Sequence, residues 1–175
     1  MSTAFLGLGS NVDARRHIRL AVHALIRRFD DAQVSPIYSS KAVGFEGENF
    51  INLVVRIETD LKPMELRHYL RTLEDKHGRD RDVPKWSDRT LDIDILLFDD
   101  LVVENEKLVL PRPEILHFAH VLKPLADIAP GMLHPLEAMS YADLWSRGDW
   151  SDARLELMDP GFLDTRLRLI SNPAE

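Results

Sequence analysis

The segment RTLDIDILLF, residues 89–98, says most about the fold and chemistry of this chain. Its alternation predicts a β-strand, because successive side chains of a strand point to opposite faces of a sheet. Asp92 and Asp94 would share one face, and the leucine and isoleucines beside them would share the other. Two carboxylates ~7 Å apart along a strand repel each other unless a cation lies between them. Magnesium is the natural candidate, because it takes one or two carboxylates together with substrate phosphates. From the spacing alone, a solvated strand face with two aspartates is the open alternative.

The loop that precedes this strand carries a cluster of basic side chains, namely Arg79, Arg81, Lys85 and Arg89. The whole chain has a net charge of −7, so this cluster runs against the average and suggests a small anionic ligand. Cations of this kind stabilise oxygens whose charge is redistributed during phosphoryl transfer. The length and polarity of the loop also suit a mobile lid that excludes water. A solvated surface loop is the alternative interpretation.

Hydrophobic patterns on either side of these two segments predict an α+β domain. Strands are expected at residues 3–9, 33–38, 50–59 and 91–98, and helices at residues 13–29 and 63–77. Asp13 is a plausible N-cap of the first helix, and the second helix begins at Pro63 and stops at Gly78. The order βαββαβ is that of a ferredoxin-like core with helices packed on a mainly antiparallel sheet. Residues 101–110 predict an extra hairpin that widens the sheet, and residues 113–129 predict helix in several pieces.

The remaining C-terminal residues are expected to extend this domain rather than to form a second one. We expect one domain over residues 1–135 and an extension over residues 136–175 that packs on it. The extension contains Trp145 and Trp150, which are expected to be packing residues because buried aromatics supply much apolar contact. It also contains an apolar stretch near Leu169.

Composition narrows the class of protein. A hydrophobic content of 45% and a charged content of 29% are ordinary for a globular domain. The chain has no cysteine, which excludes disulfides and thiolate sites and suits a reducing cytoplasm, where we expect the protein. Residues 1–9 lack the basic start of a signal peptide, and no apolar run is long enough to cross a membrane. The acidic balance and the lack of an aromatic RNA-binding pattern argue against a nucleic-acid partner.

The start of the third expected strand pairs an aromatic side chain with an amide. Phe50 and Asn52 share one face by alternation. An aromatic ring can stack on a flat heteroaromatic ligand, while an amide can hydrogen-bond the edge of that ligand. A core phenylalanine and a strand-entry asparagine are the alternative.

In combination and in this order, these segments resemble the pterin pyrophosphokinase family of folate biosynthesis. The similarity is collinear over residues 3–135, and the segment at residues 89–94 is the signature of the family. The matching pieces are Gly7-Leu8-Gly9-Ser10-Asn11, Tyr38, Val43-Gly44, Phe50-x-Asn52, Glu74, Gly78-Arg79-x-Arg81, Trp86, Arg89-Thr90-Leu91-Asp92-Ile93-Asp94, Leu122-x-Pro124-Leu125 and Ile128-Ala129-Pro130.

The resemblance implies a diphosphokinase that moves pyrophosphate from ATP to 6-hydroxymethyl-7,8-dihydropterin and releases AMP. It implies two magnesium ions on Asp92 and Asp94, with Arg79 and Arg89 as the catalytic cations. ATP would contact Glu74, Arg81, Lys85, Trp86, Ile95, Lys107 and Arg112. The pterin would contact Ser40, Val43, Phe50, Asn52 and His120. The partners would be these small molecules, without nucleic acid or membrane, and the protein would be a monomer or a weak homodimer.

The chain departs from the family pattern after residue 111. Where the family places a histidine, then an arginine, then an aromatic, this chain has Arg112, Phe118 and His120. Arg112 can still meet a phosphate and His120 can still stack, but Phe118 cannot neutralise ATP as an arginine does. Three hypotheses therefore stay open: an active pterin pyrophosphokinase, an enzyme of the same fold with a drifted pterin or nucleotide preference, and a non-catalytic pterin- or nucleotide-binding protein.

Overall fold

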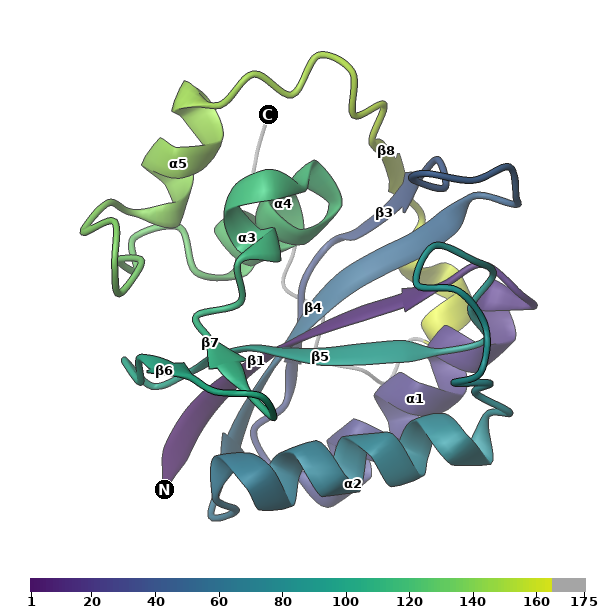
Figure 1. The fold of residues 1–175 in the computed structure, drawn as a ribbon, viewed down its shortest axis with the longest axis horizontal. Coiled ribbons are helices and arrows are strands. Elements are labelled where there is room, and N and C mark those ends of the chain that lie inside the picture. Colours follow the sequence, from purple (N-terminus) through teal and green to yellow (C-terminus); the bar gives the residue numbers. More distant parts are fainter. Residues whose placement is uncertain (165–175) are drawn as a thin grey trace.

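The fold is built around one antiparallel sheet. A computed structural model describes residues 1–164 of the chain. The main strands are β1 (Ser2–Ser10), β2 (Gln33–Val34), β3 (Ile37–Ser40), β4 (Phe50–Thr59), β5 (Asp92–Phe98) and β8 (Glu156–Met158). Their order in space is β5-β1-β4-β3-β8, and β2 also pairs with β4 (Figure 1). Without β8, this is the strand order of the expected βαββαβ core, so the prediction of an α+β fold is confirmed.

A single strand was expected at residues 33–38. The structure has two short strands there, β2 and β3, because Ser35 and Pro36 interrupt the strand. Pro36 has no N–H to donate to a neighbouring strand. The Ser35 hydroxyl accepts a hydrogen bond from the Val54 N–H (2.8 Å), so this backbone donor of β4 stays paired beside the interruption. Both short strands still pair with β4, so the break leaves the sheet continuous.

Two layers of helices cover the two faces of the sheet (Figure 1). Helices α1 (Ala14–Arg28) and α2 (Pro63–Lys76) lie on one face, and α3 (Glu114–His117), α4 (Ala119–Ile128) and α5 (Tyr141–Arg147) lie on the other. Asp13 is the N-cap residue of α1, as expected, but its backbone is left-handed (φ 45°) and its side chain makes no capping hydrogen bond. Gly78 follows α2 with φ 73°, a conformation that glycine adopts without strain and that ends the helix.

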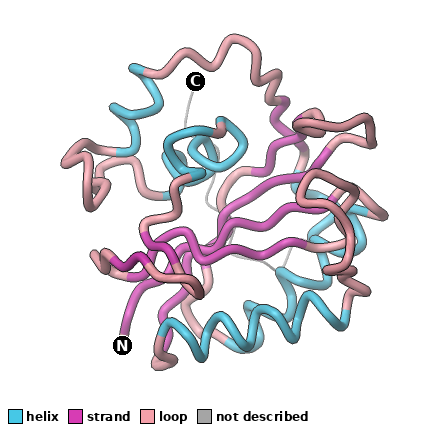
Figure 2. The backbone as a smooth tube through the Cα atoms, in the orientation of Figure 1, coloured by secondary structure: helices cyan, strands magenta, loops and turns pink. Residues whose placement is uncertain are grey.

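Each helical layer has its own hydrophobic core. Leucines and isoleucines of α1 and α2 pack on one face of the sheet, against Ile93 and Ile95 of β5. A smaller core, which includes Leu96, Leu122 and Leu125, joins the other face to α3, α4 and α5. Because strand side chains alternate, Asp92 and Asp94 project on the side of this smaller core. Helices α3, α4 and α5 do not cover the end of the sheet where Asp92 and Asp94 lie (Figure 2).

The hairpin expected at residues 101–110 is present but does not widen the main sheet. Strands β6 (Val103–Glu104) and β7 (Val109–Leu110) pair only with each other, as a separate two-stranded sheet. This part of the prediction was wrong, because the chain meets β5 just after β7, through the hydrogen bond from the Arg112 N–H to Leu96 O (2.9 Å), and not through a strand ladder. The hairpin instead forms a rim beside β5 (Figure 1).

The C-terminal residues extend the sheet in a way the sequence did not predict. Strand β8 pairs with β3 on its outer side, and the 3-10 helix η1 (Pro160–Leu163) packs on α1, where Leu163 O bonds His23. Trp145 and Trp150 stack on each other with centroids 5.4 Å apart and pack on the smaller core. The apolar stretch near Leu169 lies outside the described residues. Within those residues, none of the helices combines the length and apolar character needed to cross a membrane.

Candidate active site

A cavity of about 770 Å³ opens on the uncovered end of the sheet. Its floor consists of β1, β4 and β5, and its walls are the loop at residues 41–49, the loop at residues 79–91, the β6–β7 turn and the start of α4. The structure brings every residue of the predicted site to this one cavity. They are Ser40, Val43, Phe50, Asn52, Glu74, Arg79, Arg81, Lys85, Trp86, Arg89, Asp92, Asp94, Ile95, Lys107, Arg112 and His120.

The floor of the cavity is bare backbone where β1 crosses it. Gly9 is paired with Asp92 of β5 on one side and with Asn52 of β4 on the other, so all three face the cavity. A Cβ added at Gly9 would lie 3.6 Å from Asn52 Oδ1 and 3.7 Å from Phe50 Cδ1. Glycine at this position therefore leaves an open strip between the carboxylates and the amide. The sequence showed glycines two residues apart on a strand, a signal from which this strip could have been predicted.

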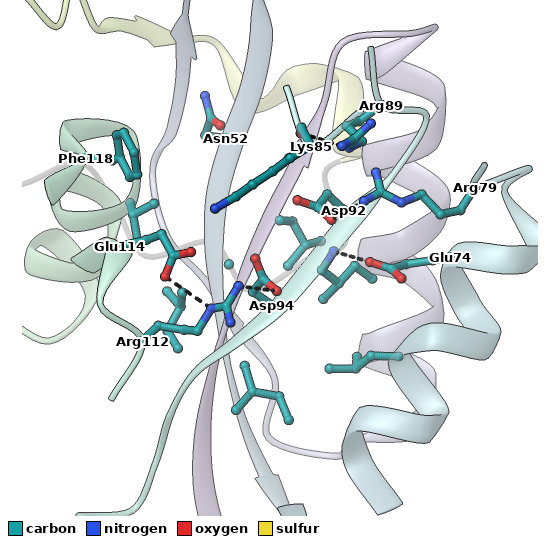
Figure 3. A pocket seen from close by; sticks show the side chains of 18 of the residues that line it. Asn52, Glu74, Arg79, Lys85, Arg89, Asp92, Asp94, Arg112, Glu114 and Phe118 are labelled. Carbon is teal, nitrogen blue, oxygen red and sulfur yellow. Dashed lines mark hydrogen bonds and ion pairs between the residues drawn. The ribbon is translucent and has the colours of Figure 1, made fainter. Parts of the chain in front are cut away.

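Asp92 and Asp94 each face an arginine across the cavity (Figure 3). Arg79 Nη2 lies 3.1 Å from Asp92 Oδ1, and Arg112 Nη2 lies 3.2 Å from Asp94 Oδ1. The two carboxylate side chains remain 41% and 44% exposed to the cavity. The cavity floor leaves the Asp94 carboxylate less well solvated than on an open surface, and this desolvation, together with repulsion from Asp92, raises the pKa of Asp94 to about 6, although Arg112 opposes the shift. The pair is therefore short of positive charge, which a metal cation would supply.

The residues at the floor fit magnesium better than a metal that needs a full set of protein ligands. No group of three or more histidine, aspartate or glutamate side chains suited to a metal occurs within residues 1–164. The aspartate pair would therefore provide two carboxylates and leave the other positions to water or ligand oxygens, as magnesium usually requires. The side chain of Arg79, beside the aspartates, indicates a site for an anionic ligand. Its Nε and Nη1 are buried and have no hydrogen-bond acceptor in the described part of the chain.

Glu74 reaches the site from α2 and organises its edge. One oxygen of its carboxylate accepts a hydrogen bond from the Ile93 N–H (2.8 Å), and the other pairs with Arg81 Nη2 (2.8 Å). Burial raises the pKa of Glu74 to about 7. The hydrogen bond from the Ile93 N–H opposes this shift, because it favours the charged carboxylate. Glu74 thus ties the loop at residues 79–91 to the strand that carries the aspartates.

Arg89 holds the same loop from within. Its guanidinium donates to three backbone carbonyls of the loop, those of Pro84 (2.9 Å), Lys85 and Asp88 (3.3 Å). Burial lowers the pKa of Arg89, with Arg79 as a second cause. In this structure the Arg89 side chain shapes the loop, and its predicted action on a transferring group stays a prediction. Lys85 extends from the loop across the cavity (Figure 3).

The end of the cavity near β3 and β4 is aromatic and neutral. The Asn52 amide donates to Ser40 Oγ (2.9 Å), and Phe50 meets Phe45 edge-on with centroids 6.3 Å apart. His120 also lines the cavity, and burial lowers its pKa to about 4, so its imidazole is uncharged at neutral pH. Uncharged rings and an amide edge are suited to a flat heteroaromatic ligand.

Basic side chains outnumber acidic ones in the cavity lining, nine to six, in a chain whose net charge is −7. Sequence reasoning missed six charged residues of this lining: Lys41, Arg67, Arg71, Asp80, Glu106 and Glu114. Arg67 and Arg71 precede Glu74 at helical spacing on α2, a signal that could have identified them. Glu114 lies 3.4 Å from Arg112 Nε and is visible only in the structure, because it belongs to a four-residue helix without periodicity.

Comparisons with known proteins agree on one family. The family model described as 7,8-dihydro-6-hydroxymethylpterin-pyrophosphokinase matches residues 5–130. The 2-amino-4-hydroxy-6-hydroxymethyldihydropteridine pyrophosphokinase of Aquifex aeolicus is 38% identical over 138 residues, which cover 78% of this chain and 86% of that protein. Its counterpart in Bacillus subtilis is 40% identical over 129 residues, covering 71% and 77%.

A solved structure gives the same fold at low identity. The wild-type HPPK-DHPS protein of Plasmodium falciparum, crystallised with pteroate, superposes with a TM-score of 0.63 at 14% identity. The match covers 83% of this chain but only 42% of that one, so this chain spans less than half the length of the solved protein. The likeness concerns the fold alone.

Proposed function

This chain belongs to the 7,8-dihydro-6-hydroxymethylpterin-pyrophosphokinase family, and from that premise we propose that it transfers the terminal pyrophosphate of ATP to 6-hydroxymethyl-7,8-dihydropterin. The products would be AMP and the pterin diphosphate, an intermediate of folate biosynthesis. The observation that carries the proposal is the row formed by Asp92, Gly9 and Asn52 across the cavity floor. It sets an acidic end, which would attract a cation, beside a neutral aromatic end, and the strand that forms the floor between them carries no side chain at Gly9.

The two ends of the cavity correspond to the two substrates. Phe50 and His120 would hold the pterin ring between them, while the Asn52 amide and the backbone near Ser40 and Val43 would recognise its edge. The hydroxymethyl group would then point along the bare strip towards the aspartates. Its oxygen attacks the β-phosphorus of ATP, the bond to the α-phosphate oxygen breaks, and AMP leaves. Positioning and charge account for catalysis of this kind, without a covalent intermediate on the protein.

The charged wall would receive the triphosphate. Arg79 is the strongest candidate for contact with the transferring group, because two of its nitrogens have no acceptor among residues 1–164. Arg81, Lys85, Trp86 and Arg89 would contribute from the loop. The remaining nucleotide contacts would come from Glu74, Ile95, Lys107 and Arg112.

We propose two magnesium ions on Asp92 and Asp94. When bound, magnesium neutralises phosphate charge and orients the reacting oxygens. The aspartates would exchange their present arginine partners for the metal, and Arg79 and Arg112 would become available to phosphate oxygens. The 3.1 Å and 3.2 Å ion pairs are compatible with such an exchange, because both are partly exposed to the cavity.

A drifted substrate preference is the second candidate, and Phe118 is the observation that favours it. This ring lines the cavity at the position where the family pattern has an arginine. The loss of one cation weakens the electrostatic attraction for a triphosphate, so either nucleotide affinity or nucleotide identity would differ.

The proposal also covers assembly and location. We propose a monomer or a weak homodimer, because the proposed site lies in one cavity and does not require a residue from a second subunit. We place the enzyme in the cytoplasm, acting on small molecules without nucleic acid or membrane. We also regard residues 1–135 as the catalytic domain with residues 136–175 as its extension, and the pairing of β8 with β3 supports that division.

The direct test is AMP release from ATP and magnesium, with and without 6-hydroxymethyl-7,8-dihydropterin. Pterin-dependent AMP is the expected result. ADP in place of AMP would mean ordinary phosphoryl transfer and would refute the reaction class. A panel of other nucleoside triphosphates and pterins separates a drifted preference from inactivity, and pterin binding without any product would indicate a non-catalytic protein.

A further inference from the structure

Three aromatic rings follow one another along the wall of the cavity. Trp86 and Phe118 meet edge to face, with centroids 6.1 Å apart and planes at 67°. Phe118 and His120 lie 5.3 Å apart with planes at 30°. Trp86 belongs to the loop at residues 79–91, whereas the other two rings belong to the start of α4. The row therefore joins the loop to the second helical layer.

We propose that Phe118 is a positioning residue whose ring holds Trp86, and with it the loop at residues 79–91, over the cavity. This inference rests on the proposed function for its effect on catalysis, but the contact itself does not. In this chain an apolar contact would hold the loop from the position where the family pattern has a cation.

The backbone at Phe118 makes it a firm support. Its N–H donates to Glu114 O (3.0 Å), which ends α3, and its carbonyl accepts from the Leu122 N–H (3.0 Å), which starts α4. Its own conformation is extended, with φ −126° and ψ 123°. Hydrogen bonds on both sides fix the Cα position, so the backbone that carries the Phe118 ring cannot move far without disturbing two helix ends.

Trp86 has a second support in the loop at residues 41–49. Gly44 has φ 81°, and a Cβ built there would lie 3.4 Å from Trp86 Cγ. The indole therefore lies against the backbone of this neighbouring loop as well as against the Phe118 ring, and Figure 2 shows the two loops side by side. The conformation of Gly44 and the close indole both favour glycine at this position.

Holding Trp86 also holds its neighbour Lys85. The Lys85 amine lies 5.2 Å from the centroid of the Trp86 ring, in a cation–π contact, and its side chain reaches over the cavity floor (Figure 3). Arg89 bonds the carbonyls of Pro84 and Lys85, so the segment around Trp86 behaves as one piece. Loss of the Phe118 ring should therefore release a cation that faces the acidic end of the site.

Limited trypsin digestion of the ligand-free protein tests the contact without any reference to activity. The bond after Lys85 is the reporter, because cleavage requires the loop to leave the cavity wall. Phe118→Ala should raise the cleavage rate about two- to tenfold, the range that corresponds to the loss of one aromatic pair. Phe118→Tyr keeps the ring and should cleave like the wild type.

The matched control is Phe162→Ala, which removes a partly buried phenylalanine of η1 that does not line the cavity. It should leave cleavage after Lys85 unchanged. If Phe118→Ala cleaves no faster than the wild type, or if Phe162→Ala accelerates cleavage equally, the proposal is wrong. Should Phe118→Ala not fold, as judged by circular dichroism, Phe118→Leu keeps most of the volume without the ring and must still cleave faster.

Steady-state kinetics then separates positioning from mere support of the fold. Loss of the contact should raise KM about two- to tenfold, with recovery in Phe118→Tyr. A variant that simply contained less folded enzyme would show a lower kcat at an unchanged KM, and that result would overturn a positioning role. If the wild type releases no pterin-dependent AMP, the proposed function fails, while the trypsin result still decides the contact.

Discussion

Substitutions at Gly9 should show whether this glycine is required for ligand binding or for the stability of the fold. In Gly9→Ala the new methyl would lie 3.6 Å from Asn52 Oδ1 and 3.7 Å from Phe50 Cδ1, which are ordinary van der Waals distances. Glycine within a strand costs roughly 0.5–1 kcal/mol relative to alanine, so the melting temperature should stay the same or rise by about 1–4 °C. Gly9→Val adds two further methyl groups, which project from the floor into the strip between Asp92 and Asn52.

The magnitude for Gly9→Val follows from overpacking. Extra methyl groups in an occupied space cost about 1–3 kcal/mol, which weakens pterin binding by roughly 5- to 150-fold. Calorimetric titration with the pterin measures this effect, and thermal unfolding measures stability in parallel. Gly131→Val is the control, because a Cβ at Gly131 meets nothing within 4 Å. If Gly9→Val binds the pterin as tightly as the wild type, the bare strip has no role in the ligand site. A large fall in its melting temperature would instead assign Gly9 to folding.

Two further predictions concern the charged groups of the cavity. Asp94→Asn should lower magnesium-dependent turnover by more than about 100-fold, since a metal supplies several kcal/mol of transition-state stabilisation. The melting temperature of this variant should stay near that of the wild type, and Asp100→Asn, at an exposed site, is the control. Unchanged turnover in Asp94→Asn would refute the metal assignment. His120 has a folded-state pKa of about 4, below the unfolded value of about 6.5, so its contribution to stability is complete above that value and is lost as the pH falls towards 4. His120→Phe should therefore lose less melting temperature than the wild type between pH 7 and pH 5, and equal losses would contradict this.

Local signals in the sequence predicted the central fold well. Strand β4 has the predicted bounds, residues 50–59, because its β-branched residues are bounded by polar loops. Helix α2 begins at Pro63 and ends before Gly78, as the residue chemistry of helix ends requires. Strand β8 was not predicted, because its three residues show no alternation of apolar and polar side chains. They pair with β3, which lies more than a hundred residues earlier in the chain. Pairing at that range depends on tertiary contacts that local patterns do not contain.

The site could be predicted where residues of suitable chemistry also follow the alternation of side chains along a strand. Alternation placed Asp92 and Asp94 on one face, and the structure has them there with Gly9 beside them. Arg67 and Arg71 were not predicted, because the buried leucines of α2 identify its core face but do not tell which part of its charged face borders a ligand cavity. The contact of Phe118 with Trp86 could not be predicted, since it depends on how an irregular loop folds back against α4.

The position of β8 has a consequence for how this protein is made. Until β8 pairs, the outer backbone groups of β3 are available to any other extended chain, and such an exposed strand edge is a template for aggregation. Roughly 120 residues separate β3 from β8, and a ribosome needs on the order of 10 s to add them. The nascent chain thus carries an unpaired sheet edge beside its ligand cavity from the synthesis of β3 until β8 emerges. Conditions that slow translation between β3 and β8 should lower the soluble yield more than conditions that slow it before β3.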